Sequence, residues 1–275
     1  MELYDNMSFE ASRLIMQGYS TSFSRSSRLF PAPMRRSIYA IYGIVRIADE
    51  IVDGYKGGDA LTLLDELERD IFRAVTNGYS PNPVVHAFAL TAKKFDIDMS
   101  LIKPFFDSMR MDLETMHYTE KRYKTYIYGS AEVVGLMCLK VFVNNDNQLY
   151  NELRSQACHL GAAYQKINFL RDLAADSKEL GRFYFPGYTF ESFDERGKYA
   201  VISDIKNDLA VAARAIAKLP VGARKATRLS SSYYSALLSK LERTPIEVIK
   251  SKRIRVPTLH KTWLYVSLIP GLSRE

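Results

Sequence analysis

Cysteine and histidine are scarce in this sequence, which argues against two common ways of stabilising a fold. The 275 residues include two cysteines, Cys138 and Cys158, and four histidines. Two cysteines are too few for a disulfide framework and fit a protein of the reducing cytoplasm. The histidines are scattered and no paired-cysteine motif accompanies them, so we expect no structural zinc site.

Long hydrophobic runs are also missing. No stretch approaches the roughly 18 consecutive apolar residues of a membrane-spanning helix, and the late apolar run at residues 263–270 is far too short. The first five residues, MELYD, are acidic and lack a basic region followed by an apolar one. We therefore expect no signal peptide and a cytoplasmic location.

Alternating strand patterns and internal repeats are absent, whereas helical spacing is found almost throughout. In one example Asp59 can cap a helix that closes at Asn77-Gly78, with one apolar face made of Leu61, Leu64, Leu67, Ile71 and Val75. Further helices are predicted at residues 8–25, 33–54, 83–95, 101–116, 123–143 and 148–176. The longest irregular stretch is expected near residues 178–198. The sequence therefore predicts one all-α domain that covers residues 1–275.

The formal net charge of +7 reflects 38 basic against 31 acidic residues. The basic residues crowd the C-terminal third, for example in residues 250–255 (KSKRIR). No nucleic-acid-binding motif accompanies them, so no nucleic-acid partner is expected. A solvated basic face is the simplest interpretation, and transient contact with an anionic membrane surface is the functional alternative. The sequence does not indicate an oligomeric state.

Two segments combine acidic and apolar residues in an unusual way. They are residues 46–53 (RIADEIVD) and residues 165–176 (QKINFLRDLAAD). In each, two aspartates are four residues apart, so on a helix both carboxylates leave the same face one turn apart. Like charges at this spacing disfavour an isolated helix by about 0.2–0.5 kcal/mol, and a cation would remove that penalty. Mg²⁺ suits the arrangement, because it takes one or two carboxylates and completes its shell with water and phosphate oxygens.

The apolar neighbours of both pairs argue against an ordinary solvated acidic face. A helix of the core would rarely contain two unpaired aspartates. Both the apolar neighbours and the unpaired aspartates are explained if two helices of a bundle direct their carboxylates into one cavity. Arg46 and Arg171 precede the two pairs and can bind either the acids or a diphosphate.

Six ordered segments resemble the squalene and phytoene synthase family. The two aspartate segments resemble its first aspartate-rich motif and its Q-x-x-N-x-x-R-D-x-x-x-D signature. Between them, residues 109–113 (MRMDL) and 126–135 (YIYGSAEVVG) are similar to the M-x-x-D-L and Y-C-Y-x-V-A-G-x-V-G segments. Residues 19–23 (YSTSF) and 181–186 (GRFYFP) match the Y/H-S-x-S-F and G-R-x-Y-x-P elements. The matches cover roughly residues 15–190.

The resemblance implies a class I isoprenoid synthase bundle with a central cavity. It implies that Mg²⁺, or alternatively Mn²⁺, binds at Asp49, Asp53, Asp172 and Asp176 with help from Asn168. The same four aspartates and Tyr128 are the expected catalytic residues. The residues expected to bind substrate are Ser20, Ser22, Tyr42, Arg46, Gln165, Asn168 and Arg171.

Several of these residues also have simpler interpretations. The two serines could lie on a helix surface, Tyr42 and Tyr128 could be core aromatics, and Gln165 and Asn168 could satisfy neighbouring backbone. Asp112 is either a structural acid or a support for the metal site. Arg253 and Arg255 could meet either phosphate or solvent.

The implied reaction joins two isoprenoid diphosphates head-to-head through a cyclopropylcarbinyl diphosphate. The leading substrate is geranylgeranyl diphosphate and the leading product phytoene, without NADPH. The runner-up is farnesyl diphosphate giving squalene, dehydrosqualene or hydroxysqualene. More distant alternatives are a terpene cyclase, a catalytically silent assembly factor and an RNA-binding protein. Three departures from the family pattern, at Ser130, Glu132 and Ala175, bear on the substrate and product.

Overall fold

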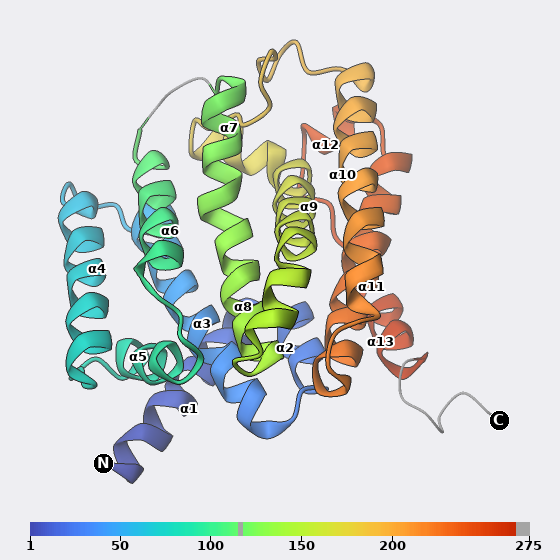
Figure 1. The fold of residues 1–275 in the computed structure, drawn as a ribbon. Helices are drawn as coiled ribbons and strands as arrows, with labels where there is room; N and C mark the ends of the chain where they lie inside the picture. Colours follow the sequence, from blue (N-terminus) through green and yellow to red (C-terminus); the bar gives the residue numbers. More distant parts are fainter. Residues whose placement is uncertain (115–117, 268–275) are drawn as a thin grey trace.

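Most of the long helices run roughly parallel or antiparallel to one another in a single bundle (Figure 1). The computed structural model describes residues 1–114 and 118–267, and in these ranges it contains helices but no β-strand. The elements are α1 (Glu2–Tyr19), α2 (Thr21–Ser27), α3 (Ala32–Asp49), η1 (Glu50–Gly54), α4 (Ala60–Asn77), α5 (Pro83–Phe95), α6 (Met99–Met111), α7 (Glu120–Ile127), η2 (Tyr128–Glu132), α8 (Val133–Val143), α9 (Asn147–Glu179), α10 (Glu195–Ile216), α11 (Val221–Arg243), α12 (Ile246–Ile249) and α13 (Thr258–Ser267). The predicted all-α class is confirmed.

Two predicted helices are continuous but contain a π-helical segment. In η1 the Tyr55 N–H donates to the Glu50 carbonyl, five residues back, at 2.9 Å. The second segment, η2, joins α7 to α8. Single π-helical turns are frequent at functional sites. Both segments fall inside family motifs, and η1 contains Asp53.

The helix predicted over residues 8–25 is wrong, because the chain breaks at Ser20. This residue has an extended backbone (φ −137°, ψ 105°) and separates α1 from α2. Its side-chain oxygen accepts a hydrogen bond from the Phe23 N–H at 3.1 Å. Ser20 is therefore an N-cap, a role that serine fills better than most residues. The periodicity of the apolar residues alone could not indicate this break.

The helix predicted after Asp59 forms and ends as expected, at Gly78 with φ 79°. Its predicted buried face is only partly correct. Leu64, Leu67 and Ile71 are buried, whereas Leu61 is 52% exposed. Asp59 precedes the helix without a side-chain capping bond, and its carboxylate instead accepts from the Tyr55 hydroxyl at 2.5 Å.

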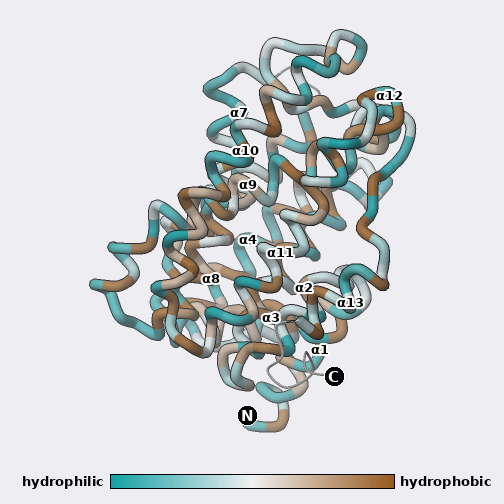
Figure 2. The backbone as a smooth tube through the Cα atoms, turned by 90° about the vertical axis from the view of Figure 1, so that its right-hand side faces the viewer, coloured by the Kyte–Doolittle hydropathy of each residue, from teal (hydrophilic) through white to brown (hydrophobic). Residues whose placement is uncertain are grey.

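The interior has two hydrophobic clusters, and α9 contributes to both. Leu153, near the start of α9, belongs to the cluster formed mainly by α1, α3–α6 and α8. Ile167 and Leu170, farther along, belong to the cluster formed with α7, α10, α11 and α12. Figure 2 shows hydrophobic residues distributed along the whole length of the bundle. This 33-residue helix is therefore the central element that links the two halves of the core.

A group of charges centred on the buried pair Lys166–Asp208 fixes α9 against α10. Lys166 of α9 donates to Asp208 of α10 at 2.7 Å and also pairs with Asp204. His159 Nδ1 lies 2.7 Å from Asp208 Oδ1. Removing one partner of a buried ion pair typically costs about 3–5 kcal/mol, because the other charge is left uncompensated. These contacts hold α9, which carries the second aspartate pair, in a fixed position.

One continuous stretch, Glu120–Val143, is long and apolar enough to span a membrane by length and composition. It comprises α7, η2 and α8. Its apolar residues Leu136, Met137 and Leu139 are buried inside the bundle. Gly129 and Gly161 allow η2 to approach α6 and α9 closely, because a Cβ on either residue would meet a backbone oxygen at 2.3 and 2.6 Å. This stretch is therefore an interior helix of the bundle.

Candidate active site

The first aspartate pair lies at the junction of α3 and η1. Asp49 is the last residue of α3, and 32% of its side chain is exposed. Arg46 Nη1 lies 3.8 Å from Asp49 Oδ2, and Arg46 also pairs with Glu50. Burial and the neighbouring Asp53 carboxylate raise the pKa of Asp49 to about 7, although Arg46 acts in the opposite direction. The negative charge at Asp49 is therefore poorly compensated.

The second pair lies on a regular part of α9. Arg171 donates to both oxygens of Asp172, from Nε to Oδ1 at 3.0 Å and from Nη2 to Oδ2 at 2.5 Å. Arg253 Nε approaches the same carboxylate at 2.8 Å. Burial, Asp172 and Asp53 raise the pKa of Asp176 to about 8. Asp53 belongs to the first pair, so the negative charges of the two aspartate segments act on each other.

Arg182, from the loop between α9 and α10, connects the two aspartate segments. Its Nη1 donates to Asp53 Oδ1 at 2.5 Å and its Nη2 to the Val52 carbonyl at 3.0 Å. Its backbone N–H donates to the Asp176 carbonyl at 2.8 Å. The side chain is only 10% exposed. Arg182 thus fixes the end of α9 to η1.

Asp112 joins three family segments at one buried carboxylate. It accepts hydrogen bonds from the hydroxyls of Tyr126 at 2.7 Å and Tyr184 at 3.2 Å. Arg182 Nε donates to the Asp112 carbonyl oxygen at 3.1 Å. Burial raises the pKa of Asp112 to about 6, opposed by Arg182 and Tyr126 and reinforced by Asp53. Asp112 therefore holds the segments of Tyr126 and Tyr184 together, and its support of a metal site remains a prediction.

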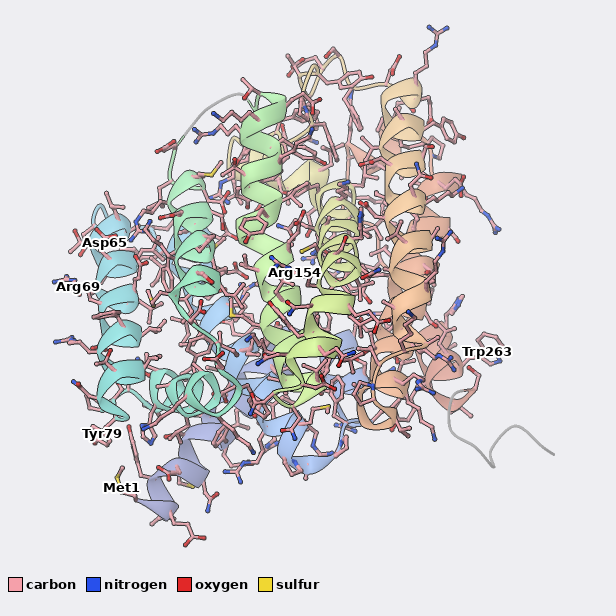
Figure 3. All side chains as sticks on the ribbon, viewed as in Figure 1. Met1, Asp65, Arg69, Tyr79, Arg154 and Trp263 are labelled. Atoms are coloured by element: carbon pink, nitrogen blue, oxygen red, sulfur yellow. The ribbon has the colours of Figure 1, made fainter. Side chains whose placement is uncertain are left out.

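Three of these residues, Tyr126, Arg182 and Tyr184, were missed as site residues by the sequence analysis. Their segments were recognised as family motifs, so the signal was present. Only the fold shows that these segments meet at Asp112. Figure 3 shows the side chains of all described residues on the ribbon.

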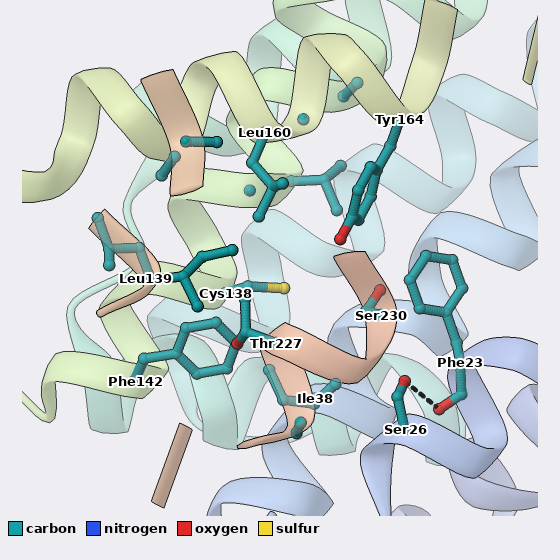
Figure 4. A pocket seen from close by; sticks show the side chains of 18 of the residues that line it. Phe23, Ser26, Ile38, Cys138, Leu139, Phe142, Leu160, Tyr164, Thr227 and Ser230 are labelled. Carbon is teal, nitrogen blue, oxygen red and sulfur yellow. Dashed lines mark hydrogen bonds between the residues drawn. The ribbon is translucent and has the colours of Figure 1, made fainter. Parts of the chain in front are cut away.

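The predicted central cavity is present and has a volume of about 250 Å³. Along α9 its lining runs from Asn168 to Leu153, 15 residues apart, which corresponds to a length of about 22 Å. Most of the lining is apolar or small, and Figure 4 shows Leu139, Phe142 and Leu160 around it. At the end near Leu153 the rings of Phe30 and Phe142 stack with centroids 5.3 Å apart. The cavity therefore suits a long hydrocarbon chain.

Aromatic rings surround the end of the cavity that adjoins the aspartates. Tyr164 and Tyr234 stack with centroids 3.8 Å apart, and Phe23 packs against both. Phe23 also lies 6.2 Å from the ring of Tyr42, whose pKa is raised to about 12 mainly by burial. The Tyr234 hydroxyl is 3.4 Å from Asn168 Oδ1. Ring faces in such positions can stabilise a carbocation.

The remaining predicted residues lie in different surroundings. Gln165 and Asn168 line the cavity, and their side chains are 3.4 Å apart. The Arg46 Nε is buried and has no hydrogen-bond partner among the described residues. Ser22 is partly buried on the short helix that Ser20 caps. Their contacts with substrate remain predictions.

Tyr128 lies apart from the other candidates. It is 38% exposed and is not among the described residues that line the cavity. Its neighbour Tyr126 instead points to Asp112. The catalytic role of Tyr128 therefore remains a prediction without a supporting contact in the part of the chain that is described.

Of the three departures from the family pattern, Ser130 lies where it can affect the substrate. It lines the cavity, and its hydroxyl is buried without a partner in the described ranges. Glu132 faces Cys158 and His159 of α9, and burial raises its pKa. Glu132 is therefore part of the contact between η2 and α9.

The donor groups fit a hard divalent cation. Arg182 connects the two aspartate segments, and burial together with mutual repulsion raises the pKa of Asp49 and Asp176. No cluster of three or more histidine, cysteine or acidic side chains with metal-binding geometry is found in residues 1–114 and 118–267. This arrangement suits Mg²⁺, which usually takes one or two carboxylates and relies on water and substrate phosphate for the rest.

Comparisons with known proteins agree with this geometry. The squalene/phytoene synthase family model matches residues 16–260. A phytoene synthase of Arthrospira platensis is 30% identical over 92% of this chain and 90% of its own length. A 4,4'-diapophytoene synthase of Staphylococcus haemolyticus is 29% identical over 66% of this chain and 62% of its own.

Solved structures show the same fold. A dehydrosqualene synthase superposes with a TM-score of 0.79 at 20% identity, covering 96% of both chains. The squalene synthase HpnC of Alicyclobacillus acidocaldarius gives a TM-score of 0.76 at 21% identity, covering 88% of this chain and 95% of its own. The fold is therefore that of the class I isoprenoid synthases, as predicted. With its two aspartate pairs, its apolar cavity and a family match over most of its length, the chain belongs to the squalene/phytoene synthase family of prenyltransferases.

Proposed function

We propose that the protein condenses two geranylgeranyl diphosphates head-to-head to phytoene. The observation that carries this proposal is that Arg182 joins the two aspartate segments while Asn168, one helical turn before Asp172, lines a long apolar cavity. The acids suit the metal-bound diphosphate groups, and the cavity suits the prenyl chains. The family is divalent-metal dependent, and we propose Mg²⁺ as the ion, with Mn²⁺ as an alternative.

Asp49, Asp53, Asp172 and Asp176 would hold the metal, with Asn168 as a further oxygen ligand. The ion supplies charge neutralisation for the leaving diphosphate. Arg46 offers a buried Nε that has no partner in the described part of the chain, which is suitable for a phosphate oxygen. We propose Arg171, Ser20 and Ser22 as the further residues of the diphosphate site.

In the first step the C–O bond of one substrate breaks, and the diphosphate leaves with the electron pair. The double bond of the second substrate attacks the allylic cation, and proton loss closes a cyclopropylcarbinyl diphosphate. After a second ionisation the ring rearranges, and loss of another proton gives the triene. The faces of Phe23, Tyr164 and Tyr234 stabilise the cations, and the apolar lining excludes water. Tyr42 and Tyr128 remain candidates for handling the protons.

The choice of the C20 substrate rests on the relatives and on the cavity. The relatives that match about nine tenths of the chain, from Arthrospira platensis and Synechococcus elongatus, are named phytoene synthases. The small residues Ser26, Ser27 and Gly135 in the lining leave room for a long chain. Farnesyl diphosphate giving a C30 product is the second candidate, because a diapophytoene synthase is similarly identical over a shorter stretch. We expect no requirement for NADPH, since proton loss completes the reaction.

We further propose that residues 1–275 act as one cytoplasmic domain with peripheral access to membranes. Residues of α1, α2, α3, η2 and α8–α11 line the same cavity, which supports a single catalytic unit.

The decisive experiment supplies each prenyl diphosphate with Mg²⁺, with and without NADPH, and identifies the hydrocarbon by mass. A C40 triene formed without NADPH is expected. A C30 product would establish the second candidate. Accumulation of the cyclopropyl diphosphate until NADPH is added would exclude the phytoene assignment and leave the condensation chemistry intact. No product from either substrate would overturn the proposal.

A further inference from the structure

The last described helix, α13, presents an apolar face that the bundle does not cover. No residue of α13 is buried. Leu259 is 85% exposed and Trp263 67% exposed, and their spacing of four places them on the same face. Trp263 points away from the bundle in Figure 3. Scattered exposed apolar residues are ordinary. In α13, however, the outward Leu–Trp pair is one turn apart, while the other apolar residues, Leu264, Tyr265 and Val266, are partly buried, and such a helix is typical of a membrane interface.

The opposite side of α13 is held to the bundle by polar contacts. The Tyr233 hydroxyl donates to the Lys261 carbonyl at 3.2 Å. Lys261 Nζ donates to the Thr21 hydroxyl at 3.3 Å, and Arg25 Nη1 donates to the Thr262 hydroxyl at 3.1 Å. The helix is therefore fixed in orientation by α2 and α11. Because of these contacts, the face that carries Leu259 and Trp263 points away from the bundle.

The charge around α13 indicates what covers this face. Two basic side chains lie where α13 meets α2, since Arg25 contacts Thr262 and Lys261 contacts Thr21. Burial and the positive charges of Arg25, Arg171, Arg255 and Arg253 lower the pKa of Lys261. The basic run at residues 250–255 directly precedes α13, and the whole chain carries a formal charge of +7. Anionic lipid headgroups complement this charge. Tryptophan and leucine side chains suit the boundary between these headgroups and the acyl chains.

We propose that α13 docks the protein on an anionic bilayer, with Leu259 and Trp263 inserted at the interface and the basic residues against the headgroups. Arg253 also contacts Asp172, so the docked surface adjoins the aspartate site. An amphiphilic prenyl diphosphate can then pass from the bilayer to the site without crossing bulk water. The docking rests on the membrane access proposed above and assigns it to one helix, whereas this last step rests also on the proposed reaction.

The sequence offers an internal probe, because Trp263 is the chain's single tryptophan. Full-length protein is mixed with vesicles of phosphatidylglycerol and phosphatidylcholine, or of phosphatidylcholine alone. We expect a blue shift of the tryptophan emission and co-flotation with the anionic vesicles, both weakened by salt. Unchanged emission together with no flotation on anionic vesicles would overturn the proposal.

Leu259→Ser should weaken flotation about tenfold, the scale expected for losing one inserted apolar side chain. Trp263→Ser should act similarly in the flotation assay. The matched control is Phe72→Ser, because Phe72 is 53% exposed on α4, which lies on the other side of the bundle in Figure 1. Equal flotation of the Leu259 and Phe72 variants would contradict the assignment of this face.

Two further measurements separate the proposal from its competitors. If raising the protein concentration without vesicles shifts the emission, and Leu259→Ser converts a dimer to a monomer in gel filtration, the face is a self-association interface and the proposal is wrong. Condensation activity with detergent-dispersed substrates should be unchanged in Leu259→Ser. Loss of docking with retained activity would support the proposal, and an inactive wild type that still docks would overturn only the proposed reaction.

Discussion

The two aspartate pairs have the same spacing but differ in backbone and in partners. Asp49 and Asp53 lie where α3 passes into the π-helical η1, whereas Asp172 and Asp176 lie on a regular stretch of α9. In each pair one acid is paired closely with arginine: Asp53 with Arg182, and Asp172 with Arg171 and Arg253. The other acid, Asp49 or Asp176, has a raised pKa.

This comparison shows that the two aspartate segments share one arrangement of charge. Each segment contributes one acid that an arginine orients and one whose charge is poorly compensated. The like-charge repulsion that the sequence pattern predicted within each pair also acts between the pairs, because Asp53 raises the pKa of Asp176. A divalent cation bound together with a diphosphate would relieve this repulsion.

The largest expected effect comes from removing either poorly compensated acid. Asp49→Asn and Asp176→Asn should each lower kcat at least ~10³-fold, because charge stabilisation of the leaving diphosphate is lost. The fold should persist, since the substitution removes a repulsive charge. Steady-state kinetics with saturating Mg²⁺ and circular dichroism would measure both properties.

The control is Asp70→Asn, which changes a surface acid of α4 that pairs with Arg73. It should retain wild-type kinetics. Full activity of both site variants, or full activity of the wild type in EDTA, would refute the metal assignment.

A smaller effect is expected from the arginines that orient the other two acids. Among the described residues Asp53 has one arginine partner, Arg182, whereas Asp172 has two. Lysine keeps the charge but cannot reproduce the fork that contacts Asp53, Val52 and Asp112 together. Arg182→Lys should therefore weaken apparent Mg²⁺ affinity or kcat about 10–100-fold, the usual range for residues that orient metal ligands.

Arg253→Lys is the matched variant, and it should have a smaller effect because Arg171 still holds Asp172 at two oxygens. Calorimetric titration of Mg²⁺ in the presence of inorganic diphosphate would compare the two variants without turnover. Equal losses would show that the number of arginine partners does not matter.

Much of this site could be predicted from the sequence, because spacing and segment order carry local information. The four motif aspartates, Arg46 and Arg171 follow from such patterns. The convergence of Tyr126, Tyr184 and Arg182 on Asp112 could not be predicted, because it depends on how helices far apart in sequence pack. The break at Ser20 was missed because it depends on a local contact. The hydrogen bond from the Phe23 N–H to the Ser20 side chain ends the helix although the apolar periodicity continues.

Arg46 allows the first segment to be tested for substrate binding separately from metal binding. Its Nε is buried and has no partner in the described structure, while its Nη atoms contact Asp49 and Glu50. Lysine would keep an ion pair with the acids but would lose the Nε–H that we propose to contact a phosphate oxygen. Arg46→Lys should raise KM for the prenyl diphosphate about tenfold and leave the apparent Mg²⁺ constant nearly unchanged. Kinetics identical to wild type would favour a purely structural arginine.

The smallest expected effect is a pH dependence of stability in the metal-free protein. In the unfolded chain the pKa of an aspartate is about 3.9. The folded pKa is about 7 for Asp49 and about 8 for Asp176, so the folded protein binds these protons more tightly than the unfolded chain. The contribution of these two acids to stability is therefore fully present below about pH 4, declines as the pH rises and is lost above about pH 8.

Because other carboxyl groups titrate in the same range, the informative quantity is the Tm difference between wild type and variant. In EDTA the Asp49→Asn and Asp176→Asn variants should gain in Tm over wild type as the pH rises from about 4 to about 8, with no further gain above it. Adding Mg²⁺ with inorganic diphosphate should remove that gain at pH 8, because the cation compensates the wild-type acids and has fewer ligands in the variants. A Tm difference that stays constant with pH in EDTA would show that the fold raises the pKa of neither acid.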